Sequence, residues 1–466
     1  MEHETEQLKL GVMPINRLML SMGLPIIVSM MLQAFYNIVD SAFVSNMAET
    51  GEQALNALTL AFPLQMLLVA VSVGTGVGTN ALLAKSLGQG NQKKASQVAG
   101  NALFLGIVIF LVFFLFGLFG VELYIGSQTT NPVIFEMAVD YLRICCTVSF
   151  GMIFFAIFEK LLQAAGHSMY STIAQVAGAL TNIVLDPIMI YGLLGFPELG
   201  VRGAALATIL GQIVSMVLAL IFHLRINKAV SNGLSYMKPS KKIIGEIYAI
   251  GLPAIIAQAL MSVMTYGLNL ILVSISESMV TAYGLYYKIQ QFILFAAFGL
   301  RDAITPILSF NYGKQDKGRI RDSMKYGLIY TLAIMVIGLA VLEIFAVPFA
   351  HLFGLSGQTE QLCISAIRII SISFLFAGAN VALQGIFQAM EGGIQSLIIS
   401  ICRQILFVLP VAWIFAQLVL RSGSPEWLVW VTFLLAEGLS TLIACILLKG
   451  IYRKKVSPLA DVTPQP

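Results

Sequence analysis

The sequence predicts an all-α integral membrane protein whose twelve transmembrane helices form two parallel six-helix repeats around a central cleft. Three observations lead to this fold class: the composition, twelve long apolar stretches and an internal repeat. Of the 466 residues, 58% are hydrophobic and 11% are charged, and the mean hydropathy is +0.87. A soluble domain carries about 25% charged residues, which cover its surface. Lipid is therefore expected to be the main solvent, and no segment is hydrophilic enough to form a soluble catalytic domain.

Twelve apolar stretches are each long enough to cross a hydrocarbon layer of about 30 Å, which takes about 20 helical residues. In the first half of the chain the predicted spans are 17–45, 54–84, 95–119, 133–163, 169–195 and 200–224. In the second half they are 243–275, 280–310, 322–347, 361–389, 395–420 and 427–449. Each stretch is predicted to be one continuous helix.

The loops between these spans differ strongly in charge. On one side the basic residues are Arg202 and Arg421. On the other side they are Lys9, Arg17, Lys85, Lys93, Lys94, Arg225, Lys228, Lys238, Lys241, Lys242, Lys314, Lys317, Arg319, Arg321, Lys325, Lys449, Arg453, Lys454 and Lys455. Cytoplasmic loops are the basic ones. We therefore expect both termini in the cytoplasm and the chain in the cytoplasmic (inner) membrane of a prokaryote.

The second half of the chain repeats the first at an offset of about 225 residues. Gly23-Leu24-Pro25 returns as Gly251-Leu252-Pro253, and Arg143-Ile144 returns as Arg368-Ile369. Each repeat has an even number of spans, so both enter the membrane from the same side, as in carriers that rock two bundles around a central site. This arrangement favours a carrier over a channel. The predicted divisions are an N-terminal bundle (1–226), a cytoplasmic linker (227–242), a C-terminal bundle (243–450) and a cytoplasmic tail (451–466).

The repeats, the glycine-containing basic loops 87–93 and 312–317, and the segments 182–187 and 203–208 resemble the multidrug and toxic compound extrusion (MATE) family. The resemblance covers essentially the whole chain. It implies a secondary antiporter that exports small amphipathic, often cationic compounds in exchange for H⁺ or Na⁺. We further expect a monomer in the lipid bilayer that is not an enzyme and needs no cofactor. The net charge of +4 is too mild to suggest binding of nucleic acid.

Two acidic residues stand out by their depth within predicted spans. Asp40 and Asp186 lie about seven and nine residues below the predicted outer ends of their spans, and Thr208 lies at a similar depth. Ionisable residues inside a membrane are costly and mark functional sites. Three polar stripes at helical spacing surround this layer. Their members are Gln33, Tyr36, Asn37 and Asp40, then Gln175, Asn182 and Asp186, then Thr208 and Gln212.

Two carboxylates with amide and hydroxyl oxygens suit a proton or a hard cation such as Na⁺. The alternative is that these groups only bond to one another between helices. In the DinF-like branch of the family that the chain resembles, the residues matching Asp40, Asp186, Asn182 and Thr208 form the coupling-ion site. The NorM-like branch uses a glutamate in the seventh span, where this chain has Met261. The resemblance therefore points to the DinF-like branch, with Na⁺, where it binds, at Asp40, Asp186 and Asn182.

Other polar residues are candidates for the wall of a substrate cleft. Beyond the three stripes, these are Glu159, Gln163, Tyr266, Asn269 and Tyr283. Aromatic residues at helical spacing also fit an ordinary core. Glu159 would either attract cations or relay protons at the inner mouth of the cleft, or else pair with a basic loop residue. Its neighbour Lys160 is not expected to face it, because adjacent helical residues point about 100° apart.

Two further expectations concern charges and rival functions. Asp140 and Arg143 are one helical turn apart and are expected to pair, whereas Arg403 and Glu437 have no assignable partner. A flippase for lipid-linked precursors is the first rival function, and extra helices or a cationic cleft would favour it. A membrane-embedded enzyme is the second, but the sequence contains no catalytic constellation that would favour it.

Overall fold

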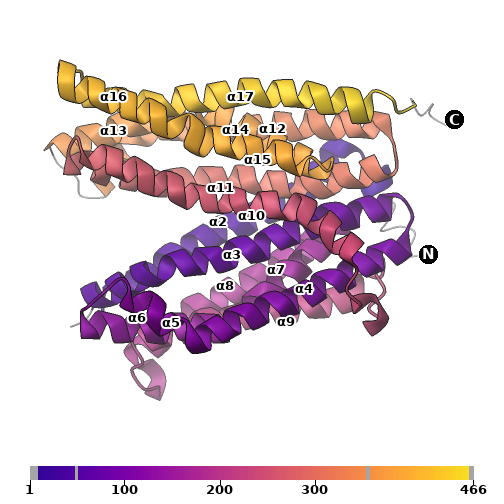
Figure 1. Ribbon diagram of the computed structural model, residues 1–466, viewed down its shortest axis with the longest axis horizontal. Coiled ribbons are helices and arrows are strands. Elements are labelled where there is room, and N and C mark those ends of the chain that lie inside the picture. Colours follow the sequence, from indigo (N-terminus) through magenta and orange to yellow (C-terminus); the bar gives the residue numbers. More distant parts are fainter. Residues whose placement is uncertain (1–8, 48–50, 353–356, 461–466) are drawn as a thin grey trace. The chain divides into compact units, whose positions relative to one another are not determined.

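The computed structural model describes residues 9–47, 51–352 and 357–460, and it is built from helices (Figure 1). Within these ranges, ten helices are long and apolar enough to cross a membrane, and two bent helix pairs bring the number to twelve. The predicted all-α transmembrane fold is confirmed. The predicted spans coincide with these helices apart from small shifts at their ends.

The helices of the first repeat come in a simple order along the chain. They are α2 (Ile15–Ser45), α3 (Gly51–Gly88), α4 (Gln92–Phe119), α5 (Val121–Gly126), α6 (Pro132–Thr147), α7 (Phe150–Ala164), α8 (Ser168–Tyr191), η1 (Leu193–Gly195) and α9 (Val201–Ile226). The segment that follows α9 contains one short helix, η2 (Leu234–Met237).

The second repeat follows the same order. Its helices are α10 (Lys241–Val273), α11 (Glu277–Gly313), α12 (Lys317–Leu352), α13 (Gly357–Ser371), α14 (Phe374–Ala389), α15 (Gly393–Ile401), η3 (Cys402–Leu406), α16 (Val408–Ser422), η4 (Glu426–Trp430), α17 (Val431–Ile451) and η5 (Tyr452–Val456). The eleventh span is interrupted by η3, a π-helical segment, a kind of local irregularity that is common at functional sites.

The fourth and tenth spans are broken, although the sequence predicted each as one continuous helix. α6 and α7 meet at 45°, and α13 and α14 meet at 52°. Near the first break Thr147 Oγ1 donates to the carbonyl of Arg143 at 2.7 Å, and at the second Ser373 Oγ donates to that of Ile370 at 2.6 Å. Hydroxyl groups that bond back to the preceding turn bend helices. Both breaks fall at the same place in their repeats, which agrees with the predicted duplication.

The helices form two compact units whose division does not coincide with the repeats. The first part of α2 belongs to unit 2, and the first part of α10 belongs to unit 1. Unit 1 contains residues 1–13 and 28–255, and unit 2 contains residues 14–27 and 256–466. Glycines allow these parts of α2 and α10 to pack closely against their units. A Cβ atom on Gly74 of α3 would lie 2.9 Å from the Ile255 backbone within unit 1. A Cβ on Gly299 of α11 would lie 2.9 Å from the Ile27 backbone within unit 2.

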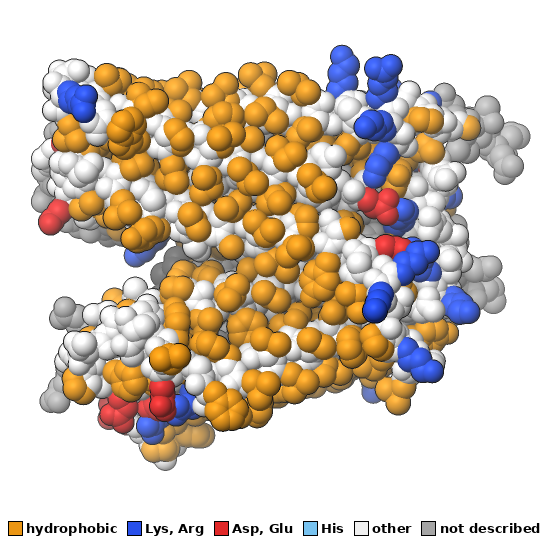
Figure 2. Space-filling view, in the orientation of Figure 1, with side chains coloured by type: hydrophobic (Ala, Val, Ile, Leu, Met, Phe, Trp, Pro, Cys, Tyr) orange, Lys and Arg blue, Asp and Glu red, His pale blue; other side chains and the backbone are white. Residues whose placement is uncertain are grey.

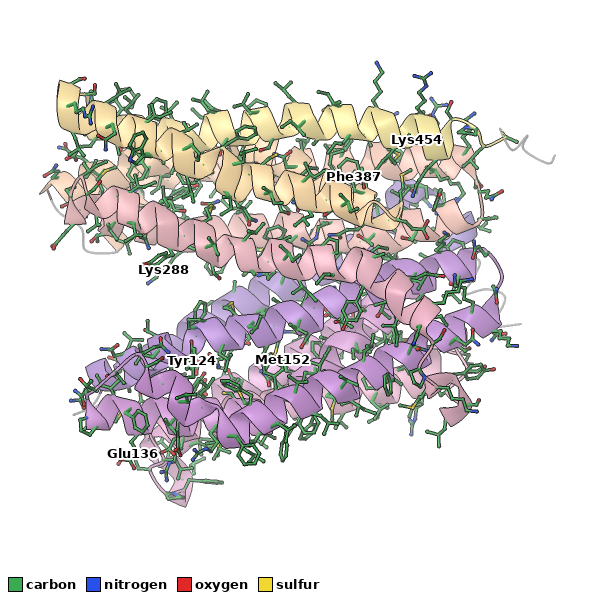
Figure 3. All side chains as sticks on the ribbon, in the orientation of Figure 1. Tyr124, Glu136, Met152, Lys288, Phe387 and Lys454 are labelled. Atoms are coloured by element: carbon green, nitrogen blue, oxygen red, sulfur yellow. The ribbon has the colours of Figure 1, made fainter. Side chains whose placement is uncertain are left out.

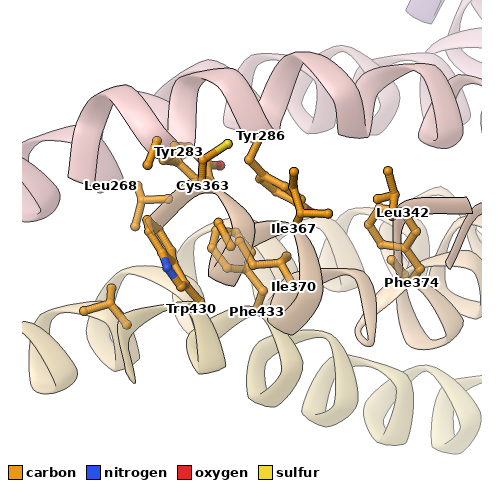
Figure 4. Packing of buried hydrophobic residues seen from close by; sticks show 14 of the residues in the cluster. Leu268, Tyr283, Tyr286, Leu342, Cys363, Ile367, Ile370, Phe374, Trp430 and Phe433 are labelled. Atoms are coloured by element: carbon orange, nitrogen blue, oxygen red, sulfur yellow. The ribbon is translucent and has the colours of Figure 1, made fainter. Parts of the chain in front are cut away.

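Side chains of different types occupy different parts of each unit. Hydrophobic side chains cover the sides of the helices, and Lys and Arg gather at one end of them (Figure 2). Inside unit 2, an apolar cluster to which α11 and α13 contribute most contains Tyr283, Tyr286, Trp430 of η4 and Phe433 of α17 (Figure 4). The Tyr283 ring stacks on Trp430 and Phe433 with interplanar angles of 17° and 16°. An apolar exterior over a packed interior is the arrangement expected of a body solvated by lipid.

Candidate functional site

The candidate site in unit 1 is built on the tight packing of α8 against α9. A Cβ atom on Gly211 of α9 would lie 2.6 Å from the carbonyl oxygen of Gly178 on α8, so the two backbones are in contact there. Small residues allow such an approach between transmembrane helices. The contact brings Asn182 Nδ2 to 3.4 Å from Thr208 Oγ1, and the same nitrogen donates to Asp186 Oδ1 at 3.2 Å.

The part of α2 that belongs to unit 1 adds the second carboxylate. Near the predicted outer ends of α8 and α2, Tyr191 Oη donates to the carbonyl of Phe43 at 2.5 Å. One turn before Phe43, the carboxyl group of Asp40 lies within hydrogen-bonding reach of Asp186. The hydroxyl group of Tyr36 lies close enough to both carboxylates to interact with them electrostatically. The structure therefore brings together Asp40, Asp186, Asn182 and Thr208, which the sequence had grouped by depth.

Three oxygen atoms of this cluster lack hydrogen-bond donors. Asp40 Oδ1, Asp186 Oδ2 and Asn182 Oδ1 are buried without a hydrogen-bond partner, and the Asp186 side chain is 0% exposed. Ionised carboxylates only accept hydrogen bonds, so two of them side by side cannot satisfy each other. Burying like charges without a counter-charge is costly. A proton or a cation between these oxygens would remove both costs.

Two helices that the sequence analysis did not assign to the site extend it. Gln65 on α3 donates to Tyr141 Oη on α6 at 3.1 Å and contacts Cys145 Sγ at 3.5 Å. Tyr141 is 4% exposed and lies close enough to Asp40 to interact with it electrostatically. Neither Gln65 nor Tyr141 belongs to a polar stripe. Helical spacing of polar residues therefore did not single out either of them.

The remaining candidates for the substrate cleft lie in varied surroundings. Gln33, Gln175 and Gln212 are partly exposed on α2, α8 and α9. The side chain of Asn37 lies outside the described part of the chain. In unit 2, Tyr266 is 68% exposed and Asn269 is half-buried, both on α10. Tyr283 is 1% exposed within the apolar cluster, so it belongs to the core, the alternative that the sequence left open.

The surroundings of Glu159 on α7 correct the expectation that Lys160 points away from it. Lys160 Nζ lies 4.0 Å from Glu159 Oε2 and donates to Gln163 Oε1 at 3.0 Å. Gln163 Nε2 in turn donates to Glu159 Oε1 at 3.1 Å. The long lysine side chain curls back along the helix, which a comparison of Cα directions does not take into account. Lys160 and Gln163 are 2% and 0% exposed, and the Glu159 side chain is 17% exposed, so the three residues form a bonded triad that is buried except at Glu159.

The predicted pair between Asp140 and Arg143 is wrong. Asp140 Oδ2 accepts a hydrogen bond from Arg202 Nε of α9 at 2.6 Å. Arg143 Nη2 instead donates to Glu122 Oε1 of α5 at 2.5 Å. Both partners come from other helices, and sequence spacing within α6 contains no information about them. This corner of unit 1 is therefore held by two ion pairs between helices.

Unit 2 contains a buried ion pair that the sequence could not assign. Both Nε and Nη2 of Arg403 donate to the carboxylate of Glu437, with distances of 2.7–3.0 Å. Asn380 Nδ2 donates to Glu437 Oε2 at 2.7 Å. The side chains of Arg403 and Glu437 are 9% and 14% exposed. Arg403 lies in the π-helical segment η3, so this irregular turn carries the guanidinium that pairs with α17.

Comparison with known proteins identifies the family. The MatE family model matches residues 25–188 and 253–414, one segment in each repeat. The chain belongs to the MATE family. Over 437 residues it is 25% identical to the multidrug export protein MepA of Staphylococcus aureus (strain MRSA252), covering 93% of each chain.

Solved MATE structures have the same fold. A crystal structure of MATE in complex with MaL6 superposes with a TM-score of 0.88 at 24% sequence identity, covering 96% of this chain and 99% of the other. The outward-facing conformation of a multidrug resistance MATE family transporter of the MOP superfamily gives a TM-score of 0.87 at 24% identity. That match covers 94% of this chain and 97% of the other. This MATE family member is thus a multi-pass membrane protein with the fold of its relatives.

Proposed function

We propose that this MATE protein is a secondary antiporter that exports small amphipathic, often cationic compounds in exchange for H⁺ or Na⁺ by alternating access. One observation carries the proposal: the carboxyl groups of Asp40 and Asp186 adjoin each other in unit 1, and one buried oxygen of each has no donor. A site with this electrostatic deficit binds a positive ion and loses it when the site opens to a compartment where the ion is scarce.

The energy available from such an ion is adequate for export. One charge that crosses a potential of 100 mV releases about 2.3 kcal/mol. Since about 1.4 kcal/mol corresponds to a factor of ten, one ion per cycle supports a substrate gradient of about fifty-fold. An ion concentration gradient adds to this value. In the proposed cycle, the ion bound at Asp40 and Asp186 biases unit 1 toward one conformation, and the substrate biases it toward the other.

The substrate class follows from the relatives and from the residues available. Relatives from two Staphylococcus species that match the chain over most of its length are named multidrug export proteins. Gln33, Gln175 and Gln212 supply adaptable polar groups on the helices of unit 1. These observations favour export of drugs over the flipping of lipid-linked precursors, the rival function considered from the sequence. The apolar Met261 in the seventh span favours the DinF-like branch, in which coupling resides in the first half.

The proposed orientation places both termini in the cytoplasm of a prokaryote. It rests on the asymmetry of basic residues between the two sets of loops. Single cysteine reporters test it in intact cells, with a thiol reagent that does not cross the membrane. Reporters at Glu122 and Glu277 are expected to react, whereas those at Lys93, Lys241 and Lys317 are expected to stay unlabelled. Glu49, a third outer position, lies outside the described residues. Labelling of the lysine positions alone would invert the topology.

The proposed transport is tested most simply in everted membrane vesicles that contain the protein. Accumulation of a fluorescent cation inside the vesicles is measured after a pH gradient or a Na⁺ gradient is imposed separately. One of the two gradients is expected to drive accumulation above that of vesicles without the protein. Accumulation that neither gradient changes would contradict ion-coupled export.

A further inference from the structure

Unit 2 contains a shallow cavity, open to the surface, at the start of the tenth span. The matching corner of unit 1 helps to interpret it. The cavity has a volume of about 430 Å³ and lies between α13 and η4. Its lining residues are Gln361, Ile364, Ser365, Arg368, Ile369 and Trp427. Arg368 is the repeat counterpart of Arg143, since the two lie about 225 residues apart in matching Arg-Ile pairs.

In unit 1 the matching corner is rich in carboxylates. Arg143 is paired with Glu122, and Asp140 is paired with Arg202. Glu136, labelled in Figure 3 near the start of α6, adds a third acidic side chain. At this corner of unit 1, every arginine named has a carboxylate within ion-pair distance.

The second repeat replaces these groups one by one. At the same offset of about 225 residues, Ser365 occupies the position that matches Asp140, and Trp427 occupies the position that matches Arg202. Gln361 occupies the position that matches Glu136, and Val347 the position that matches Glu122, the partner of Arg143. Among the described residues, no carboxylate lies within ion-pair distance of the Arg368 guanidinium. The three acids of unit 1 thus have no counterpart at the matching positions. Glu343 lies close by and accepts from Ser371 Oγ, one turn after Arg368, at 3.1 Å, but it forms no ion pair with Arg368.

The nearest acidic side chains by sequence are engaged elsewhere. Glu360 Oε1 lies 2.7 Å from His351 Nε2, and Glu426 Oε2 accepts from Gln358 Nε2 at 2.9 Å. Trp430 Nε1 donates to Ser365 Oγ at 3.2 Å, which leaves the oxygen of Ser365 committed to the wall of the cavity. An exposed arginine without a carboxylate retains its capacity for bidentate binding of an anion.

The position of Arg368 along its span indicates which anionic group lies close enough to bind it. Arg368 lies one turn before the 52° break between α13 and α14, and the 16 residues of α14 add about 24 Å of helix. The hydrocarbon core is about 30 Å thick. With α14 ending at the cytoplasmic side, Arg368 lies near the outer boundary of this core, and its side chain tilts toward the N-terminus of α13, which is the outer end. Trp427 suits the same level, because tryptophan is enriched at membrane interfaces.

From this difference between the repeats we propose that the Arg368 cavity binds the phosphodiester headgroup of an anionic phospholipid from the outer leaflet. The guanidinium of Arg368 donates two hydrogen bonds to phosphate oxygens. Gln361 supplies a further donor, and the apolar surfaces of Ile364, Ile369 and Trp427 contact the glycerol and the upper acyl chains. Occupancy by lipid supplies the counter-charge that Glu122 and Asp140 supply in unit 1.

The proposal is tested by lipid titration of the full-length protein, purified in detergent and depleted of lipid. Native mass spectrometry with phosphatidylglycerol reports the apparent Kd. Arg368→Gln is expected to weaken binding about ten-fold or more, the usual effect of losing a charged hydrogen-bond donor. Ser365→Asp, which restores the carboxylate found in unit 1 and keeps the arginine, is expected to weaken binding to a similar extent. Arg421→Gln removes an exposed arginine outside the cavity and is expected to change the Kd less than two-fold.

Two outcomes would overturn the proposal. In the first, Arg368→Gln and Arg421→Gln have equal effects, which would mean that lipid binds by net charge alone. In the second, inorganic phosphate at millimolar concentration displaces the lipid completely, which would assign the cavity to a free anion. Thermal unfolding in lipid-free detergent separates these results from misfolding. The three variants are expected to unfold within a few degrees of the wild-type protein.

Discussion

The two units share a plan of helices but differ in the chemistry of their interiors. In unit 1 the carboxylates Asp40 and Asp186 adjoin each other, and one oxygen of each is buried without a donor. Counted from the two Gly-Leu-Pro segments, the position in the second repeat that matches Asp40 is Leu268, which is 0% exposed in the apolar cluster. The buried charges of Arg403 and Glu437 in unit 2 satisfy each other.

What the repeats keep in common belongs to the backbone. Gly74 and Gly299 support matching close contacts between helices, and the fourth and tenth spans break at matching places. The side chains that carry charge differ between the repeats, both at Asp40 and Asp186, the proposed ion site, and at the corner near Arg368. The two copies of the duplicated scaffold thus share their packing, while unit 1 alone has the adjoining carboxylates of Asp40 and Asp186.

The largest expected effect is the loss of efflux when either carboxylate of unit 1 is neutralised. Asp40→Asn and Asp186→Asn each remove a charge that the proposed ion needs, while the amide is close in size to the carboxyl group. Both variants are expected to lower drug efflux from intact cells to the level of cells without the protein. Efflux of a fluorescent cation and the amount of protein in the membrane are measured together.

The matched control for these variants is Asp322→Asn, which neutralises an exposed aspartate on α12 in unit 2. It is expected to leave efflux unchanged. Near-normal efflux in both Asp40→Asn and Asp186→Asn would contradict the claim that the carboxylates of unit 1 couple transport to an ion.

The sequence was sufficient to predict the number, order and approximate ends of the spans, because long apolar runs can satisfy the backbone in lipid in one way. It also grouped Asp40, Asp186, Asn182 and Thr208, because depth in a span can be counted along the chain. Side-chain partners on different helices could not be predicted by counting residues along the chain. Gln65 with Tyr141 and Arg403 with Glu437 lie on different spans, and their pairing depends on helix rotation and packing. The helix breaks depend on hydroxyl contacts with the preceding turn, which apolar periodicity does not record.

The second prediction concerns the ion pair of unit 2, which we expect to be structural. Arg403→Gln leaves Glu437 charged in a buried setting and is expected to lower the free energy of unfolding by about 3–5 kcal/mol. The double variant Arg403→Met with Glu437→Leu removes both charges and is expected to recover most of that loss. Thermal unfolding in detergent measures both effects. A double variant as unstable as Arg403→Gln would contradict this explanation, because the loss of stability would then not come from an unpaired buried charge.

The smallest of these effects concerns Glu159, whose carboxylate lies in the triad with Lys160 and Gln163. Glu159→Gln removes the negative charge beside a buried lysine, so the expected loss of stability is about 1–3 kcal/mol. Efflux of cationic and neutral substrates is expected to fall by the same factor. A selective loss of cationic substrates, measured with a matched pair of charged and uncharged dyes, would instead support the role in attracting cations.

The most direct test of the difference between the units is the release of the bound ion when substrate binds to the purified protein. Release of H⁺ is followed with a pH indicator in weak buffer, and release of Na⁺ is followed with radioactive Na⁺. The wild-type protein and the Arg403→Met, Glu437→Leu variant are expected to release the same ion in equal amounts, whereas Asp186→Asn is expected to release none. Undiminished release from Asp186→Asn, or its loss only in the unit 2 variant, would contradict coupling through the carboxylates of unit 1.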